Sequence, residues 1–484
     1  MSNQEINTDP LVKPRLLVHS DIGNEPDDQQ SLVRLVTYLN EIDLEGLIPT
    51  TSMWQSWKIN PHLMERVINA YGGTPRDNLM KHTGNYYPTR DELLSLIKPG
   101  SIKYGMAGVG EGHDSEGSEW TIQVVDKPDP RPIWITLWGG ANCLAQALWK
   151  IRNTRSQKEL DDFIKKIRVY SHQDQDDSAP WIRKEFPNLF YVASPSPEVP
   201  SPQKRFIRKG NRYRAPINLL RFSMKVLKDL RKVTWVGISG ELHYKFKGGP
   251  YSKIITNKWL KVNIRRNHGP LGEVYPRTIF AMEGDTVTFL WLIRSGLRSS
   301  QSPTYGGWGG RYELYTPKGE SRPIYSDVED TVVVGDGLGE LKGDKKGIYV
   351  SNQATIWRWR EAYQYDFAAR MDWASTPNYE DANHPPSVVI HGELNRSVKG
   401  TEEIILDATG TSDPDGNNLS FYWFHYREAG SYEGTVIIED PTSLKTSMSF
   451  KDPNKKGIIH IILQVKDDGN PCLFRYARII INVY

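Results

Sequence analysis

The chain has almost no cysteine and no long hydrophobic run, and these absences restrict its class. The two cysteines, Cys143 and Cys472, fall in segments expected to be separate domains, so no disulfide between them is predicted. No stretch is long and apolar enough to predict a membrane-spanning helix. Charge of neither sign dominates, because 61 Lys and Arg nearly balance 58 Asp and Glu. With no basic run interleaved with aromatic residues, a nucleic-acid partner is not expected.

Residues 1–7 do not have the pattern of a signal peptide. This is compatible with a cytoplasmic protein or with the mature form of an exported one. A length of 484 residues predicts two or three domains rather than a single core. The 15 Trp and 24 Tyr suit either stacking on the apolar faces of sugar rings or the core of a large protein.

An acidic turn follows the first apolar run, Leu16 to Val18, and precedes a helical pattern from Gln29 to Leu39. The turn holds four carboxylates within eight residues, at positions 21, 25, 27 and 28. Like charges at this density repel each other unless they are solvated or neutralised by a cation. Calcium accepts six to eight oxygen ligands in irregular geometry, which predicts a calcium site. The alternative is an acidic helix start that favours the helix dipole.

Residues 15–315 alternate between apolar β-type runs and helical or irregular stretches, which predicts a mostly parallel sheet flanked by helices. The runs expected to be strands are 16–18, 45–49, 133–137, 167–171 and 234–238. Residues 316–378 contain a Gly-rich stretch at 334–339, expected to be a surface loop. They also contain a helical pattern at 356–371, expected to pack on the first domain.

The sequence pattern changes near the two prolines at 385 and 386. Short alternating runs then follow at 387–391, 403–407, 420–423, 459–465 and 478–483. Strands at this spacing predict an antiparallel β-sandwich of about 100 residues. The segments 408–416 and 465–469 resemble the signature and the ending of polycystic-kidney-disease-like modules, which commonly accompany exported carbohydrate-active enzymes. The predicted organisation is an α/β domain at 12–378, with 316–378 packed on it, and a sandwich at 384–484.

The acidic turn resembles the N-terminal signature of nucleoside hydrolases, in which a strand runs into an Asp-rich turn ending in a double Asp. Five residues separate Asp21 from Asp27, more than is usual in that family. The chain is more similar to a divergent branch, described as cellulose-binding proteins with a nucleoside-hydrolase-like domain. The resemblance implies that Asp21, Asp27 and Asp28 hold calcium and that Asp21 is the general base. It also implies export, and hence a periplasmic or extracellular location.

Two further segments resemble the family pattern. In residues 135–148 the resemblance implies that the Leu137 or Trp138 carbonyl coordinates calcium and that Asn142 binds substrate. In residues 280–286 it implies a late calcium ligand at Asp285, beside Glu283, which is expected to bind substrate or help cap the helix. Gly284 stands where the family usually has a His that assists the leaving base. This departure argues against release of a purine or pyrimidine.

A proton donor for the leaving group is expected from one of two loops. Residues 169–183 are typical of the divergent branch and carry His172, Asp174 and Asp176. A carboxyl group flanked by other carboxylates has a raised pKa, which suits a general acid near neutral pH. A second cation site or a solvated acidic turn is the alternative. The Gly-rich loop 108–118 resembles the His-Gly loop that lines the nucleoside hydrolase pocket, and it supplies His113 as a further candidate.

Several polar and aromatic residues are expected to contact a sugar. Two Trp follow the second strand, where the family often has a sugar-binding Gly-Asn, and this favours a glycan over a nucleoside. Glycines around Trp308 are expected to expose it as a stacking platform, and Arg311 is expected to bind a hydroxyl or carboxylate. The full set of expected substrate contacts is Asn24, Trp54, Glu116, Asn142, Glu283, Trp308 and Arg311.

These observations predict a calcium-dependent glycoside hydrolase that acts on a plant or algal glycan, with water activated by Asp21 attacking the anomeric carbon. Asp174, Asp176, His113 or His172 would protonate the leaving oxygen. A non-catalytic carbohydrate-binding or cellulose-binding protein is the first alternative, and an N-ribohydrolase of nucleosides is the second. A homodimer is plausible by analogy with nucleoside hydrolases.

Overall fold

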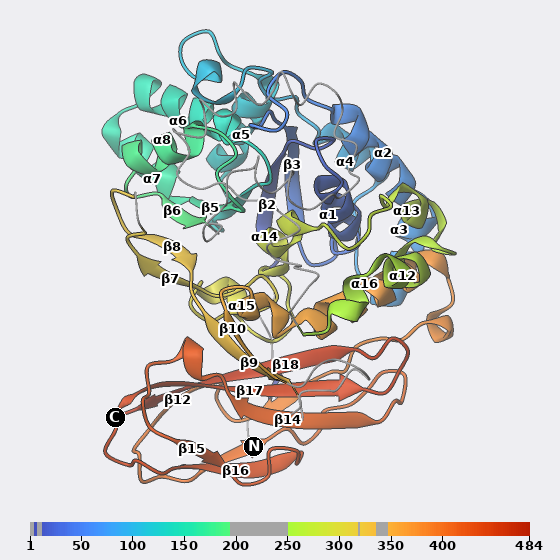
Figure 1. Ribbon diagram of the computed structural model, residues 1–484, viewed down its shortest axis with the longest axis vertical. Helices are drawn as coiled ribbons and strands as arrows, with labels where there is room; N and C mark the ends of the chain where they lie inside the picture. Colours follow the sequence, from blue (N-terminus) through green and yellow to red (C-terminus); the bar gives the residue numbers. More distant parts are fainter. Residues whose placement is uncertain (1–3, 7–11, 194–249, 318–319, 335–346) are drawn as a thin grey trace.

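A computed structural model of the chain describes residues 4–6, 12–193, 250–317, 320–334 and 347–484 (Figure 1). An α/β domain is followed by a β-sandwich, and the two are in extensive contact. The strand predicted at 234–238 and most of the Gly-rich stretch at 334–339 lie outside the described residues. Within the described ranges, no helix is long and apolar enough to cross a membrane.

A seven-stranded sheet forms the centre of the α/β domain, in the order β3-β2-β4-β5-β6-β8-β7. Six strands are parallel, and only the edge strand β7 runs antiparallel to its neighbour. The inner strands are almost continuously buried, as expected for a parallel sheet covered on both faces. The predicted α/β class with a mostly parallel sheet is confirmed. The strands are β2 (Arg15–Ser20), β3 (Asp43–Pro49), β4 (Ile133–Leu137), β5 (Ile167–Ser171), β6 (Phe190–Ala193), β7 (Tyr312–Tyr315) and β8 (Ile324–Asp327).

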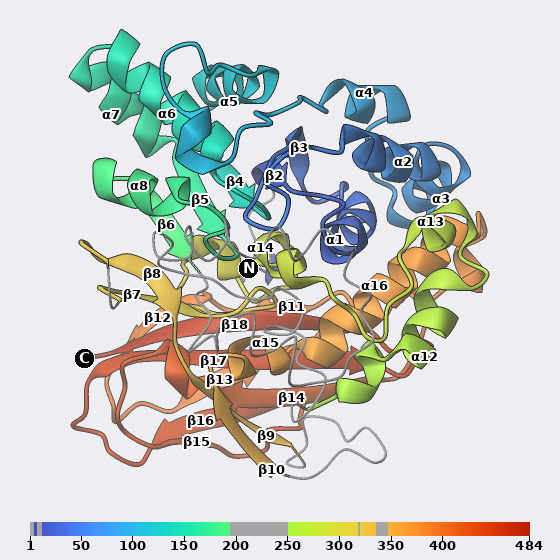
Figure 2. The same ribbon diagram turned by 45° about the horizontal axis from the view of Figure 1, so that its top comes forward.

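Helices cover both faces of this sheet, and each face has its own hydrophobic cluster. Figure 2 shows α5 to α8 on one side of the strands and α1 to α4 with α16 on the other. The first group is α5 (Glu116–Asp126), α6 (Asn142–Thr154), α7 (Gln157–Lys165) and α8 (Ser178–Glu185). The second is α1 (Asp27–Val36), α2 (Pro61–Tyr71), α3 (Thr74–Thr83), α4 (Arg90–Ser95) and α16 (Arg360–Ser375). Shorter helices are α12 (Asn257–Leu260), α13 (Gly269–Val274), α14 (Val287–Leu290) and α15 (Ala354–Trp357).

The helix predicted at 356–371 is two helices in the structure. Helices α15 and α16 are separated at Trp359, whose φ of −107° and ψ of 3° depart from helical values. The Trp359 ring packs against Phe424, Tyr426 and Tyr476 of the sandwich. Burial of this large ring at the domain contact therefore overrides a helical pattern that is continuous in the sequence.

The C-terminal domain has a four-stranded sheet in the order β12-β18-β17-β14 and a three-stranded sheet in the order β13-β16-β15. A hydrophobic cluster centred on residues such as Trp423, Ile461 and Ile479 fills it. The predicted sandwich is therefore present, but β12 runs parallel to β18, so it is not wholly antiparallel. Its strands are β12 (Asn395–Val398), β13 (Ile404–Asp407), β14 (Leu419–His425), β15 (Val436–Ile438), β16 (Lys445–Phe450), β17 (Gly457–Asp467) and β18 (Phe474–Val483). Two small ribbons pair β1 (Gln4–Ile6) with β11 (Val389–His391) and β9 (Asp330–Val334) with β10 (Gly347–Ser351).

Strand β18 joins the two domains through buried polar contacts. The Arg478 guanidinium donates to the carbonyl oxygens of Leu297 at 2.6 Å and Gly306 at 2.9 Å. It also lies 2.8 Å from Nδ1 of His460, which accepts from it. Arg475 pairs with Asp366 of α16 at 2.9 Å. Separating the domains would remove the two carbonyl acceptors of the buried Arg478 and the ion pair of Arg475 with Asp366.

His460 makes the stability of this contact depend on pH. Burial, together with the Arg478 charge beside it, lowers the pKa of His460 to about 2. Below pH 6.5, His460 binds a proton in the unfolded chain, where its pKa is near 6.5, but stays neutral in the folded chain. The free energy of unfolding therefore falls as the pH drops below 6.5, by about 1.4 kcal/mol per pH unit for this one group.

Replacement of this group tests the effect. His460→Gln keeps an acceptor for Arg478 but cannot titrate, so its unfolding free energy should fall less steeply between pH 6.5 and 5.0. Chemical denaturation of wild type, His460→Gln and the exposed control His62→Gln measures the difference. An unchanged slope in His460→Gln would show that His460 does not carry this pH dependence.

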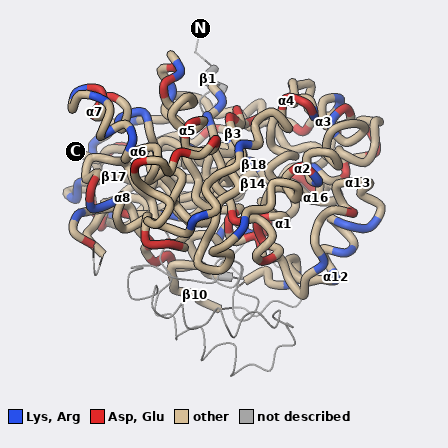
Figure 3. The backbone as a smooth tube through the Cα atoms, turned by 90° about the horizontal axis from the view of Figure 1, so that it is seen from above, with Lys and Arg blue, Asp and Glu red and all other residues tan. Residues whose placement is uncertain are grey.

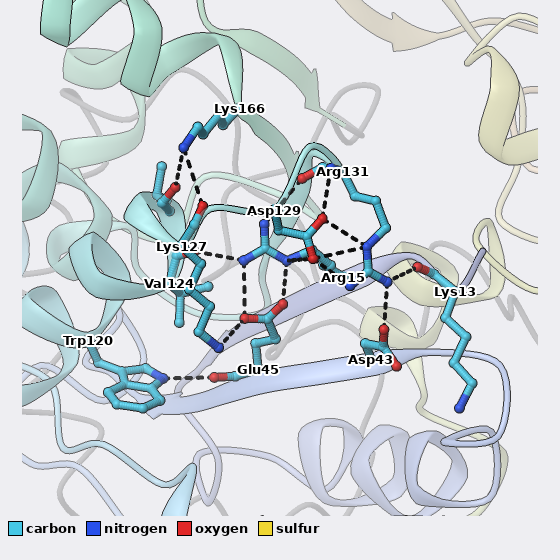
Figure 4. Close-up of polar contacts among 11 residues, drawn as sticks. Lys13, Arg15, Asp43, Glu45, Trp120, Val124, Lys127, Asp129, Arg131 and Lys166 are labelled. Atoms are coloured by element: carbon cyan, nitrogen blue, oxygen red, sulfur yellow. Dashed lines mark hydrogen bonds and ion pairs between the residues drawn. The ribbon is translucent and has the colours of Figure 1, made fainter. Parts of the chain in front are cut away.

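At the amino-terminal edge of the sheet, a polar network fixes the starts of β2 and β3 (Figure 4). The buried Arg15 pairs with Glu45 and donates to the Val124 carbonyl at 2.7 Å. Lys127 reaches the same Glu45 at 2.6 Å. Arg15, Asp43, Glu45, Lys127, Asp129 and Arg131 all form ion pairs, so this edge has a structural role.

Candidate active site

The polar residues singled out in the sequence lie mainly at the carboxyl edge of the sheet. Strands β2, β3, β4 and β5 are adjacent and parallel, so the loops that follow them meet at one edge. These loops begin near residues 21, 50, 138 and 172. Ligands of open α/β sheets bind at this edge, which makes it the candidate active site.

Three carboxylates of this edge converge. Asp27 and Asp28, in the first turn of α1, and Asp285, in the 3₁₀ turn η4 (Gly284–Thr286), place oxygen atoms within 4.8 Å of one another. All three side chains are buried. Ser20 donates to Asp28 at 2.5 Å, whereas neither Asp285 oxygen has a hydrogen-bond partner among the described residues.

The electrostatics of this cluster favour a cation. Burial, and then the charges of Asp27 and Asp21, raise the pKa of Asp285 well above its usual value. Burial and the neighbouring carboxylates raise the pKa of Asp28 in the same way. Buried like charges are costly unless they are neutralised or paired. An all-oxygen set with an orphaned carboxylate fits a hard divalent cation such as calcium.

Asp21 lies at the end of β2 beside this cluster. The Ser52 hydroxyl donates a hydrogen bond to its carboxylate, and Gln55 Nε2 donates to its backbone carbonyl at 3.0 Å. Burial is the main cause that raises the pKa of Asp21 to about 7, and the Asp27 charge adds to it. The loop after β3 thus positions Asp21 through two residues, Ser52 and Gln55.

The double glycine after β4 brings Asp176 to the same place. A Cβ on Gly139 would lie 2.6 Å from the Asp21 amide nitrogen, and one on Gly140 would collide with Asp176 Oδ2. Ser178 donates to Asp176 Oδ1 through its amide at 3.0 Å, while Oδ2 has no partner among the described residues. Burial raises the pKa of Asp176 to about 6. Asp21 and Asp176 therefore contact adjacent glycines of one turn.

The other proposed proton donors are placed differently. Asp174 forms a two-pronged ion pair with Arg183, at 2.8 and 2.7 Å, and Glu320 pairs with the same guanidinium. His172 is fully buried at the end of β5. His113, on the Gly-rich loop, lies 3.0 Å from the Lys103 amine. Both oxygens of Asp174 bind Arg183, whereas Asp176 keeps one oxygen without a partner among the described residues, so the structure favours Asp176 over Asp174.

The carbonyl groups expected to bind the ion, and Asn142, expected to bind substrate, all have partners within the protein. The Leu137 carbonyl accepts from the His172 amide at 3.2 Å, and the Trp138 carbonyl accepts from Gln175. Asn142 donates to the Lys103 carbonyl at 2.7 Å and to Thr51, while its Oδ1 has no partner among the described residues. Asn142 thus keeps one acceptor at the start of α6.

Four expected substrate contacts lie in the core or pair with other groups of the protein: Glu283, Trp308, Arg311 and Glu116. Glu283 is buried and accepts from Arg34, from Tyr275 and from Thr286, so it holds η4 against α1. Trp308 is only 1% exposed and lies in the core, so it does not form the expected stacking platform.

Arg311 is likewise buried and pairs with Asp330 at 2.7 Å. It is therefore not open to a ligand. Glu116 is exposed at the start of α5 and pairs with Lys98 at 3.2 Å. That contact ties α5 to the segment after α4.

The loops after β2 and β3 supply the exposed groups of the edge. Asn24 is exposed at the tip of the acidic turn, and its amide donates to the Asp21 carbonyl at 3.3 Å. Trp54 is half-buried, whereas Trp57 on the same loop is 55% exposed. Asn60 ties this loop to the acidic turn by donating to the Ile22 carbonyl at 2.8 Å. Trp57 is thus the more accessible aromatic surface beside the acidic turn.

Two family models match the chain. Residues 15–312 match the model described as "Cellulose-binding Sde182, nucleoside hydrolase-like domain". Residues 403–483 match the model described as "Cellulose-binding protein Sde0182, C-terminal domain". No curated protein matches the chain.

Among solved structures, a nucleoside hydrolase-related protein from Saccharophagus degradans, associated with carbohydrate metabolism, is 34% identical. The match covers 98% of this chain and 100% of that one, with a TM-score of 0.75. The type III effector XopQ, solved with adenosine diphosphate ribose, is 11% identical over 76% of this chain and 96% of that one, with a TM-score of 0.31. The latter likeness is too weak to support an argument.

A parallel sheet with this acidic carboxyl edge defines the nucleoside-hydrolase-like class of proteins. Here that domain is joined to a β-sandwich, in the same arrangement along the whole length of the Saccharophagus relative. The chain belongs to the Sde182 family of cellulose-binding proteins, which have a nucleoside-hydrolase-like domain.

Proposed function

We propose that the chain is a calcium-dependent hydrolase of glycosidic bonds that acts on a glycan. The observation that carries this proposal is the joint placement of two kinds of group at one sheet edge. A buried carboxylate cluster suited to a divalent cation lies beside Asp21, and a second carboxylate with a raised pKa, Asp176, contacts the same double-glycine turn. Paired carboxylates of unequal pKa are the usual equipment for glycoside hydrolysis.

Asp27, Asp28 and Asp285 would hold the calcium ion, and Asp21 would join them. The bound ion would supply charge to orient sugar hydroxyls and to lower the pKa of the attacking water. Asp285 is the most informative of these ligands, because its two oxygens have no hydrogen-bond partner among the described residues. The cluster therefore gains an interaction when a cation enters rather than exchanging one.

Asp21 takes a proton from the attacking water. Its carboxylate is held by the Ser52 hydroxyl, which fixes the orientation of the accepting oxygen. A cation close by favours the ionised form of Asp21, offsetting the burial that raises its pKa to about 7. The new bond joins the water oxygen to the anomeric carbon while the bond from that carbon to the leaving oxygen breaks.

Asp176 donates a proton to the leaving oxygen. Burial raises its pKa to about 6, which keeps about a tenth of the group protonated at pH 7 and about half at pH 6. The two hydrogen bonds from Ser178 engage Oδ1 and leave Oδ2 as the atom that can carry the proton. After the products leave, Asp21 gives its proton to solvent and Asp176 regains a proton from solvent, so both carboxyl groups return to their starting forms.

The sugar would stack on Trp57, the exposed aromatic beside the acidic turn. Asn24 at the tip of that turn would supply a hydrogen bond to a hydroxyl group. A polymeric glycan implies an exported enzyme, so a periplasmic or extracellular location belongs to the proposal.

Replacement of Asp21 tests the reaction. Asp21→Asn should lower kcat at least about a thousandfold, because it removes the base while keeping the acceptor for Ser52. Release of reducing sugar and of free nucleobase is measured on a panel of glycans and nucleosides, in calcium and in a chelator. Asp91→Asn, an exposed Asp on α4, is the matched control and should keep wild-type activity.

A non-catalytic glycan-binding role is the second candidate, and the description of both matched family models as cellulose-binding favours it. No turnover on the whole panel, with glycan retention equal in wild type and Asp21→Asn, would establish that role instead. Release of nucleobase without reducing sugar would establish an N-ribohydrolase.

A further inference from the structure

A cationic cleft lies beside the candidate active site. It encloses about 560 Å³ and is lined by residues of α1, α2, α13, α12 and the segments that follow α12 and α13. Five of its lining residues are cationic and only one, Glu273, is acidic. The cations are Arg66, Lys261, Arg265, Arg266 and Arg277. Figure 3 shows Lys and Arg gathered along α12 and the chain after it.

These five cations are not neutralised by the protein. Within the described ranges, none of them takes part in an ion pair, although other arginines do, such as Arg183 and Arg370. The net charge of the chain is only +3, so the cluster does not reflect a generally basic composition. Like charges this close repel one another, and an anion in the cleft would relieve the repulsion.

Arg265 shows that the cleft is a built feature. Its guanidinium donates to the Asn257 side-chain oxygen at 2.9 Å, while its Nε has no partner among the described residues. Burial, and the charge of Arg277 facing it, lower the pKa of Arg265. An arginine that is fixed through one guanidinium nitrogen and has another nitrogen without a partner is well placed for a two-pronged contact with a carboxylate or sulfate.

The cleft and the acidic cluster share their walls. Gln29 lines the cleft, follows Asp28 directly in α1, and donates to the Val274 carbonyl at 2.7 Å. The next residue, Gln30, donates to the Pro276 carbonyl and accepts from the Met282 amide. The segment from 274 to 285 therefore runs along α1 from the cleft to Asp285.

We propose that this cleft is a subsite for an anionic sugar, and that the glycan recognised by this chain carries carboxylate or sulfate groups. The inference rests on the proposed function for its choice of a sugar ligand, but it concerns binding and needs no turnover. A volume of about 560 Å³ lies within the range of small-molecule sites. Neutral cellulose fragments would gain nothing from the five cations.

Calorimetric titration of the full chain in a chelator tests the subsite. The probes are an oligogalacturonate, which carries carboxylates, a sulfated galactan oligosaccharide, and a neutral cello-oligosaccharide of equal length. Arg265→Gln with Arg277→Gln should weaken binding of the anionic probe about tenfold or more and leave the neutral probe unchanged. The first two probes distinguish a carboxylate ligand from a sulfate ligand.

Two matched variants keep the test sharp. Lys158→Gln with Lys165→Gln removes the same charge from exposed positions on α7 and should leave all three affinities unchanged. If loss of Arg265 unfolds the chain, Arg66→Gln with Arg277→Gln changes only exposed positions and should show the same selective loss.

Three results would overturn the inference. They are equal binding of neutral and anionic probes, unchanged affinity in both cleft variants, and equally tight binding of a single-stranded oligonucleotide. None of them affects the Asp21 experiment, so failure of the subsite and failure of the proposed hydrolysis are distinguishable. Calcium-dependent turnover of neutral glycans, for example, would retain the hydrolase and reject the subsite.

Discussion

Asp285→Asn is expected to make the calcium-free chain more stable at pH 7.5 and to abolish its stabilisation by calcium. In the folded chain the pKa of Asp285 is raised by burial and by its acidic neighbours. An unfolded Asp ionises near pH 4, so the folded state loses stability as the pH rises above that value. The amide removes this loss because it carries no charge, and it also removes a ligand from the ion.

Thermal unfolding in EDTA and in excess calcium measures both effects. Calcium at a hundred times its dissociation constant should stabilise the wild-type chain by about 2.7 kcal/mol, and the variant by far less. The exposed substitution Asp91→Asn serves as the control and should respond to calcium as wild type does. Equal calcium stabilisation in wild type and Asp285→Asn would show that the cluster at the carboxyl edge does not hold the ion.

Asp174→Ala is expected to cost about 3 to 5 kcal/mol of folding stability, because among the described residues it leaves the buried Arg183 with Glu320 alone as an ionic partner. Asp176→Asn is expected to behave in the opposite way. It keeps the Ser178 hydrogen bonds to Oδ1, removes a buried acid, and should fold as well as wild type while losing turnover.

Chemical denaturation and steady-state kinetics of the two variants separate structure from chemistry. Asp174→Asn is a useful third member, because it keeps the shape of the side chain but not its charge. The proposed roles would be reversed if Asp176→Asn kept full activity while Asp174→Asn folded normally and lost it. Turnover retained by all three would instead place the proton donor elsewhere.

Much of the fold could be predicted because its signals are local. The strands at 133–137 and 167–171 coincide with β4 and β5, since apolar runs bounded by turn residues mark buried parallel strands. The break at Trp359 could not be predicted, because its cause is a set of rings more than sixty residues further along the chain. The parallel pairing of β12 also depends on a distant strand.

The candidate site divides along the same line. Asp27, Asp28 and Asp285 meet because each stands at the start of a helical turn beside the same sheet edge. Glu283 also carries a carboxylate, but a distant partner pairs with it: Arg34 lies 249 positions from Glu283. A single sequence does not show such partners. A charged side chain that is ion-paired in the fold therefore cannot be distinguished there from one that is open to a ligand.

The cationic cleft illustrates the limit most clearly. Its cations come from position 66 and from positions 261–277, and no basic run marks them in the sequence. They form one feature only because α2 and the chain around α12 and α13 pack against α1. Charge balance over the whole chain concealed a local excess of one sign.

The domain contact formed by Arg478, Arg475 and Trp359 determines how the sandwich could present a polymeric glycan to the α/β domain. A binding module on a flexible tether searches a wide volume and raises the local concentration of any chain segment within reach. Here buried contacts hold the sandwich against α16 in one orientation. Any glycan-binding surface on the sandwich is therefore held at a fixed distance and angle from the acidic edge. The two domains would act as one rigid unit and not as a tethered pair.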